Sequence, residues 1–160
     1  MLKINLIVVG KIKEKYFTDA IVEYTKRLSR FSDFNIIELK DLPTPENDNE
    51  NDQLNILKKE GDLILSKVNP KDYVIAMTIE GNIISSELLA EKMSKLAFNG
   101  FSTIDFIIGG SLGLSNDVKN RADYQFSLGK ITLPHQLARV VVSEQIYRSF
   151  MINNHTPYHK

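Results

Sequence analysis

The stretch DFIIGGSLGLSNDV, from Asp105 to Val118, contains an apolar run that ends in a glycine cluster. Residues 104–108 have the length and β-branched content of a buried strand. The next five residues, Gly109 to Gly113, include the pattern G-x-S-x-G, which in serine hydrolases places the nucleophile on a sharp turn. The role of this glycine loop decides between several folds and chemistries.

Four interpretations compete for the glycine loop. A nucleophile elbow needs a helix that begins at once, but Ser115 is the better helix N-cap, so Ser111 would lie four residues upstream. A dinucleotide site needs G-x-G-x-x-G in the first strand–helix unit, and a P-loop needs a following G-K-[ST]; the chain has neither. The fourth interpretation is a tight turn in which glycine supplies a positive φ. On local sequence alone, the turn is the strongest of the four.

Composition limits the class of protein. The chain has 160 residues, of which 42% are hydrophobic and 25% charged, so we expect one soluble globular domain spanning residues 1–160. It has no cysteine, which excludes disulfides, thiolate metal sites and thiol nucleophiles. The longest apolar run near the start, Leu6 to Val9, is too short for a signal peptide or a membrane span, so we expect a cytoplasmic protein.

Both ends of the chain are basic, although the net charge is zero. Residues 1–30 hold seven Lys and Arg against three acids, and residues 130–160 hold four against one, so the centre is acidic. If the two ends meet in the fold, they form one positive surface suited to phosphate backbones. Solvated faces would give the same pattern, and charge alone leaves both interpretations open.

Strands and helices are expected to alternate along the chain. The expected strands are 3–9, 34–39, 73–79, 104–108 and 124–127, and the expected helices are 15–28, 54–68, 86–98, 116–121 and 134–152. The segment 41–53, which has two prolines and many Asn and acidic residues, is expected to form a surface loop. This order predicts a single α/β domain with a mostly parallel sheet and helices on both faces.

The last expected helix, 134–152, has Pro134 in its first turn and apolar side chains in almost every direction around its axis. A helix of this kind is buried on more than one side. In a domain of this size, we expect another subunit to provide the second cover.

Four segments together resemble one known family: IVVGKIKEKY at 7–16, FIIGGSLGL at 106–114, SLGKITLPHQLARVVVSEQIYRSF at 127–150 and PYHK at 157–160. Over its whole length the chain is similar to the ribosomal RNA large-subunit methyltransferase H family. That family belongs to the SPOUT class of S-adenosylmethionine-dependent methyltransferases. The resemblance implies an α/β knot fold with a C-terminal trefoil knot, and a homodimer. It also implies methyl transfer from S-adenosylmethionine to N3 of a pseudouridine in 23S (large-subunit) rRNA on the assembled ribosome.

The same resemblance, carried over position by position, implies a set of cofactor contacts. They are Met77, Gly109, Leu128, Gly129, Lys130, Ile131, Thr132 and Leu133. The glycines would let the backbone approach the cofactor closely, and apolar side chains would enclose its adenine. Ser111 would then be a loop residue without a nucleophilic role.

The implied reaction suggests three catalytic residues. Methylation of N3 requires the loss of a weakly acidic imide proton, so a base, or a cation that stabilises the anion, should help. His159 suits the first role and Arg139 the second, while Tyr158 could stack on the target base. For Arg139, a buried structural ion pair is an equally good interpretation. We hypothesise that the tail closes over the cofactor pocket when the ribosome binds, with His159 nearest the chemistry.

No metal site is expected. His155 and His159 are four residues apart, but Pro157 lies between them and no cysteine or nearby acid completes a ligand set. Glu144 and Arg148 have the spacing of an intrahelical ion pair, and an interface contact is the other interpretation. The alternative to an enzyme is a catalytically silent RNA- or ribosome-binding module of the same fold. Only the enzyme needs an intact cofactor pocket.

Overall fold

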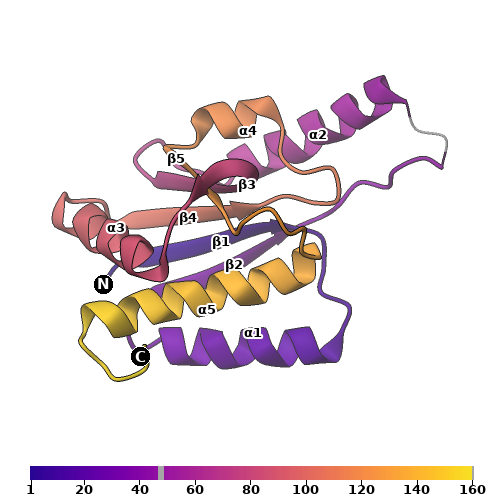
Figure 1. Ribbon diagram of the computed structural model, residues 1–160. Coiled ribbons are helices and arrows are strands. Elements are labelled where there is room, and N and C mark those ends of the chain that lie inside the picture. Colours follow the sequence, from indigo (N-terminus) through magenta and orange to yellow (C-terminus); the bar gives the residue numbers. More distant parts are fainter. Residues whose placement is uncertain (47–48, 160) are drawn as a thin grey trace.

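The computed structural model describes residues 1–46 and 49–159, in which strands and helices alternate as expected (Figure 1). The strands are β1 (Lys3–Val9), β2 (Asp33–Leu39), β3 (Tyr73–Ile83), β4 (Thr103–Ile108) and β5 (Tyr124–Ser127). The helices are α1 (Lys15–Leu28), α2 (Glu50–Leu65), α3 (Ser86–Phe98), α4 (Asn116–Arg121) and α5 (His135–Asn153).

The strands form one sheet in the order β2-β1-β4-β3-β5, and every neighbouring pair is parallel. Helices α1, α3 and α5 lie on one face of the sheet, and α2 and α4 on the other (Figure 1). The α/β architecture with a parallel sheet and helices on both faces is therefore confirmed. The trefoil knot stays a prediction.

The two faces of the sheet carry separate apolar cores. Along β1, Leu6 packs on the face of α3 and α5, together with Phe106, whereas Ile7 and Ile107 pack on the face of α2 and α4. All four side chains are fully buried, and each contributes roughly 1.5–3 kcal/mol by leaving water. Because both faces are covered, the strands are continuous apolar runs rather than alternating ones.

Helix α5 packs against both α1 and α3. Every residue from His135 to Ile152 is buried or half-buried, but only Arg139, Val142, Ser143, Ile146, Ser149 and Met151 are fully covered by the chain's own residues. Cover of the half-buried side by another subunit stays a prediction. The packing of α1 on α5 also brings the two basic ends of the chain together.

Several helix boundaries differ from the sequence prediction. Helix α2 begins at Glu50 rather than at 54, because Asn49 and Asp52 form a reciprocal capping box, and it ends at Leu65 rather than at 68. The loop prediction is therefore wrong for 50–53, and its residues 47 and 48 lie outside the described residues. Helix α5 begins one residue after Pro134, which occupies the N-cap position.

Strand β3 runs four residues further than predicted and contains an irregularity. Both Met77 and Asn82 pair with Phe126 of β5, so residues 78–81 bulge out of the ladder. Gly81 lies against β5 so closely that a Cβ there would be 2.8 Å from the carbonyl carbon of Gln125. The bulge places residues 78 and 79 near the carboxyl end of β4, where the glycine loop begins.

Candidate functional site

The glycine loop after β4 folds back on itself. The N–H of Gly113 donates to the carbonyl oxygen of Gly110 at 3.0 Å, and Gly113 has a φ of +83°. A Cβ at Gly109 would overlap the carbonyl oxygen of Gly113 and lie 2.7 Å from its carbonyl carbon. Glycine at 109 is therefore required by the loop itself, and the tight-turn interpretation describes its conformation correctly.

The loop does not present a serine nucleophile. Ser115, four residues after Ser111, caps α4, with its Oγ accepting the N–H of Val118 at 3.3 Å, and the helix itself begins at Asn116. Ser111 is exposed, and no hydrogen bond among the described residues joins it to a histidine or a carboxylate. An activated serine needs such a base within hydrogen-bond reach.

A cavity of about 480 Å³ opens between this loop, the bulge of β3 and the segment between β5 and α5. Its walls are mostly apolar, with four glycines among the lining residues. The lining residues are Met77, Thr78, Ile79, Ile108–Gly113, Phe126–Gly129, Ile131–His135 and Ala138. Size and lining match the pockets that hold small molecules and cofactors.

Most of the implied cofactor contacts meet at this cavity. Met77, Gly109, Leu128, Gly129, Ile131, Thr132 and Leu133 line it, whereas Lys130 lies between two lining residues and is exposed. The sequence did not single out Thr78, Ile79, Phe126 or Ala138 as lining residues. Their position depends on the bulge of β3 and on the path into α5, and neither produces a recognisable sequence pattern.

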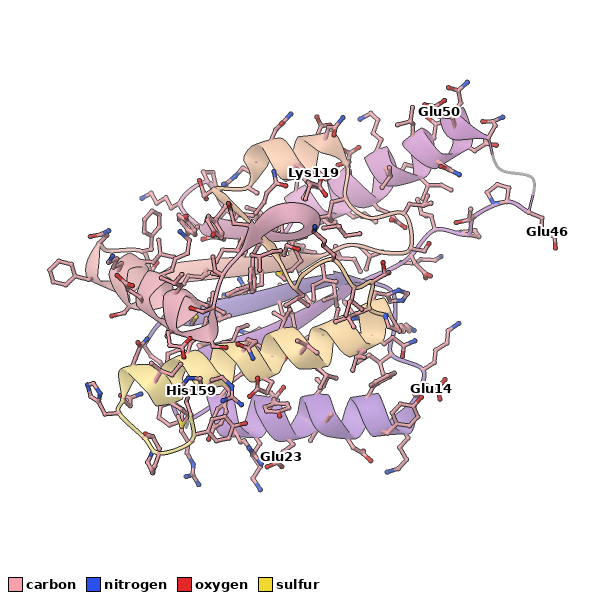
Figure 2. The ribbon with its side chains drawn as sticks, in the orientation of Figure 1. Glu14, Glu23, Glu46, Glu50, Lys119 and His159 are labelled. Carbon is pink, nitrogen blue, oxygen red and sulfur yellow. The ribbon has the colours of Figure 1, made fainter. Side chains whose placement is uncertain are left out.

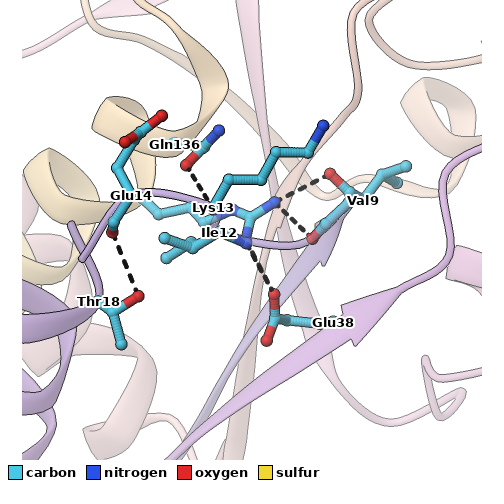
Figure 3. Close-up of polar contacts among 9 residues, drawn as sticks. Val9, Ile12, Lys13, Glu14, Thr18, Glu38 and Gln136 are labelled. Carbon is cyan, nitrogen blue, oxygen red and sulfur yellow. Dashed lines mark hydrogen bonds and ion pairs between the residues drawn. The ribbon is translucent and has the colours of Figure 1, made fainter.

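Arg139 is fully buried and does not line the cavity. Its guanidinium donates to the carbonyl oxygens of Val9 at 3.0 Å and Gly10 at 2.7 Å, and pairs with Glu38 at 3.2 Å (Figure 3). Burial lowers its pKa, and the charge of Glu38 opposes that shift. These contacts agree with the structural ion pair of the two sequence interpretations: Arg139 fixes α5 to the carboxyl end of β1.

The C-terminal tail is docked on its own subunit. Figure 2 shows His159 against the C-terminal half of α5. Its Nδ1 lies 3.0 Å from Nη1 of Arg148, and its Nε2 lies 2.7 Å from a carboxylate oxygen of Glu87 in α3. Because arginine only donates, Nδ1 accepts and Nε2 carries the hydrogen that Glu87 accepts.

Tyr158 is held in the same place. Its hydroxyl donates to Glu144 at 3.1 Å, and its ring makes an edge contact with Tyr147 at 5.0 Å between centroids. Burial, followed by the charge of Glu144, raises the pKa of Tyr158 to about 12. Glu144 also forms the expected ion pair with Arg148. Lys160, the last residue of the tail, lies outside the described residues.

The docked tail is far from the cavity of its own chain. Ala138 lines the cavity near the start of α5, whereas Arg148, which holds His159, lies ten residues further along the helix. A rise of 1.5 Å per residue makes this separation about 15 Å. The structure therefore does not bring His159 and Tyr158 together with the cofactor contacts within one chain.

Residues 1–46 and 49–159 contain neither a membrane-spanning helix nor a cluster of metal ligands. No helix there is both long and apolar enough to pass through a lipid bilayer. No group of three or more His, Cys, Asp or Glu side chains gathers there in a way that could hold a metal ion.

Comparison with known proteins identifies the family. A family model described as "Predicted SPOUT methyltransferase" matches residues 2–159. This chain belongs to the SPOUT methyltransferase family. The resemblance found in the sequence is thereby confirmed, and membership of this methyltransferase family implies a methyl-donor cofactor.

Relatives agree over the full length. The SPOUT methyltransferase is 58% identical over 160 residues to "Ribosomal RNA large subunit methyltransferase H" of Oenococcus oeni, covering 100% of both chains. It is 53% identical over 159 residues to the protein of the same name from Leuconostoc mesenteroides, a match that covers 99% of this chain and 100% of the relative. A solved structure titled as a probable methylase family protein from Haemophilus influenzae Rd KW20 shares the fold, with a TM-score of 0.55 and 16% identity. That match covers 100% of this chain and 72% of the other.

Proposed function

We propose that this protein is an S-adenosylmethionine-dependent methyltransferase that modifies N3 of a pseudouridine in large-subunit rRNA on the assembled ribosome. The observation that carries the proposal is the cavity at the glycine loop, in a chain that is 58% identical over its full length to an rRNA large-subunit methyltransferase H. A ribosomal substrate also favours a cytoplasmic location.

The residues of the cavity fit S-adenosylmethionine. Apolar side chains such as Met77, Phe126 and Leu133 can enclose an adenine ring, and the backbone at Gly109 and Gly129 can contact its polar edge. When bound, the cofactor would supply an activated methyl group on its sulfonium. The chain itself has to bind the donor, exclude water and remove the imide proton from the acceptor.

The tail is assigned to the acceptor side of the reaction. We infer that the protein is a homodimer in which Tyr158 and His159 of one subunit serve the cavity of the other. One support is the distance of about 15 Å along α5 between the docked tail and the cavity of the same chain. The other is that the tail is held by half-buried polar contacts, which can be replaced by contacts with another subunit. His159 would accept the imide proton, and Tyr158 would stack on the base.

Arg139 has a positioning role in this proposal. Nη1 and Nη2 of its guanidinium are occupied by Val9, Gly10 and Glu38, so it holds the start of α5 and thereby the cavity wall at 131–135. Direct stabilisation of the substrate anion by Nη1 or Nη2 would require these contacts to break, and Nε, which has no partner among the described residues, is buried.

Exposed lysines near the start of α5 are suited to the rRNA backbone. Lys11 and Lys13 follow β1, and the N–H of Lys13 donates to Gln136 of α5 at 3.0 Å. Lys130 is exposed between two residues of the cavity wall. Contacts of this kind with phosphates give affinity that falls steeply with salt.

Calorimetry with S-adenosylmethionine tests the cofactor assignment. Ile131 lines the cavity and is 80% exposed, so Ile131→Arg should obstruct the cavity without disturbing the core. Phe98→Arg is the matched control, because Phe98 is 91% exposed at the end of α3. We expect wild type and the Phe98 variant to bind equally and the Ile131 variant to lose at least tenfold in affinity. Equal binding by all three would contradict the assignment of the cavity.

The catalytically silent module is the weaker candidate. It would need the basic surface and no cofactor pocket, whereas the cavity and the family membership favour the enzyme. Wild-type protein that binds ribosomes but no S-adenosylmethionine would support the silent module.

A further inference from the structure

A second, smaller cavity adjoins the first. It has a volume of about 140 Å³ and lies at the carboxyl ends of β1 and β2, beside Ile56 and Glu60 in the middle of α2. Gly110, Ser111, Leu112 and His135 line both cavities, so the glycine loop and His135 form their common wall. The smaller cavity can hold several water molecules and hence part of a small polar ring.

Glu60 of α2 is the unusual residue of this wall. It is 5% exposed, and its Oε2 accepts the N–H of Leu42 at 3.2 Å. Oε1 accepts no hydrogen bond from the described residues and lies 3.4 Å from the position that a Cβ of Gly110 would take. No Lys or Arg among the described residues forms an ion pair with this carboxylate. Oε1 is not among the buried side-chain oxygens that lack a partner, so it stays open to the small cavity and can accept a hydrogen bond from a ligand there.

The surroundings of Glu60 favour a neutral hydrogen-bond donor. Burial, and then the charge of Asp41 on the same wall, raise its pKa, while the N–H of Leu42 lowers it. His135, the other titratable group of the wall, has a pKa lowered by burial and by the charge of Arg139. The imidazole is therefore mostly neutral at pH 7 and gives Glu60 no full positive charge.

We propose that the small cavity binds the edge of the acceptor base and that Glu60 accepts the N1–H of pseudouridine. This inference rests on the proposed function. Pseudouridine is joined to its ribose through carbon, so N1 keeps a hydrogen that uridine lacks. N1 and N3 flank the same carbonyl group. N3 can therefore face the donor in the large cavity while N1 points past the common wall to Glu60.

This arrangement makes Glu60 a specificity-determining residue. A uridine in the same place would cover Oε1 of Glu60 without donating a hydrogen to it. Sites that hydrogen-bond a substrate N–H or O–H reject analogues without it by factors that reach about 10⁴–10⁵. The wild-type enzyme should therefore discriminate strongly between the two nucleotides, and Glu60→Leu should not.

The experiment compares two kinds of ribosome from cells lacking this methyltransferase. One kind carries pseudouridine at the target, and the other carries uridine there because the pseudouridine synthase is also deleted. We measure kcat/KM for methyl transfer to both, and the affinity for S-adenosylhomocysteine by calorimetry. The proteins are wild type, Glu60→Leu, Glu60→Gln and the control Asp62→Asn, which removes an exposed carboxylate of the same helix.

We expect Glu60→Leu to lose at least 100-fold in kcat/KM on pseudouridine ribosomes and most of its discrimination, with S-adenosylhomocysteine affinity unchanged. Glu60→Gln keeps an acceptor oxygen and should fall between the two, while Asp62→Asn should match wild type. A wild type that methylates both ribosomes equally would overturn the inference and leave the proposed function intact. A Glu60→Leu protein that loses S-adenosylhomocysteine affinity would overturn it too, because the cavity would then hold the donor. A wild type that methylates neither ribosome would overturn the proposed function itself.

Discussion

The buried carboxyl of Asp105 should make the stability of this protein fall as the pH rises toward neutrality. Asp105 lies in β4, is fully buried, and accepts a hydrogen bond from the amide of Asn5 at 2.8 Å, while its Oδ2 has no partner. Burial raises its pKa to about 7; the Asn5 hydrogen bond opposes the shift, and the nearby Asp72 reinforces it.

The sign follows from the proton balance. A pKa of about 7 in the folded protein, against an ordinary value of 3.8, means that the native state holds the proton more tightly than the unfolded chain. The stabilisation is complete at pH values below about 3.8 and is lost as the pH rises through 7. At about 1.4 kcal/mol per pH unit, the group lowers the free energy of unfolding by about 3 kcal/mol between pH 5 and pH 8.

Asp105→Asn isolates this contribution, because an amide resembles the protonated acid and cannot ionise. Urea denaturation of both proteins should show that the stability advantage of the variant grows by about 3 kcal/mol from pH 5 to pH 8. Asp62→Asn, which removes an exposed carboxylate, is the control and should show no such growth. An advantage of Asp105→Asn that is the same at both pH values would refute the reasoning.

Three further perturbations test the site. Arg139→Ala should lower the free energy of unfolding in urea denaturation by about 2–5 kcal/mol, because it leaves two carbonyl groups without their donor and removes a fully buried side chain; a loss under 1 kcal/mol would contradict the anchoring role. Ser111→Ala should keep nearly full methyl transfer, and an inactive Ser111 variant would reopen the nucleophile interpretation. Gly109→Val should abolish S-adenosylmethionine binding and also lower the melting temperature, because the valine side chain would collide with the backbone of Gly113. Deletion of residues 157–160 should leave sedimentation as a dimer unchanged and reduce methyl transfer by about 10²-fold or more; full turnover would exclude the tail.

Much of the fold could be predicted from local sequence. The strands that pack on both faces are continuous apolar runs, and Ser115 caps its helix as expected. The start of α2 was missed because Asn49 and Asp52 form a capping box inside a segment that otherwise reads as loop. The bulge of β3 was missed because it depends on pairing with β5, which is distant in sequence.

The candidate site also has a part that the sequence predicts and a part that it does not. Gly109 and the segment 128–133 follow from motifs, and the structure brings most of them together around one cavity. The sequence resemblance explained Gly109 by close contact with the cofactor. In the structure, glycine is required at this position because a side chain would collide with the backbone of Gly113. Glu60 could not be found from its spacing. It is an acid in a polar helix, and only the folded chain shows that it is buried beside the glycine loop.

Transfer of a tritiated methyl group tests the central claim most directly. Ribosomes from cells lacking the protein are incubated with labelled S-adenosylmethionine and either wild type or Ile131→Arg, and the modified nucleotide is then mapped. The account predicts that wild type labels one pseudouridine of large-subunit rRNA at N3 and that Ile131→Arg labels it at least tenfold more slowly. A wild type that binds S-adenosylmethionine and ribosomes but leaves the rRNA unlabelled would contradict it.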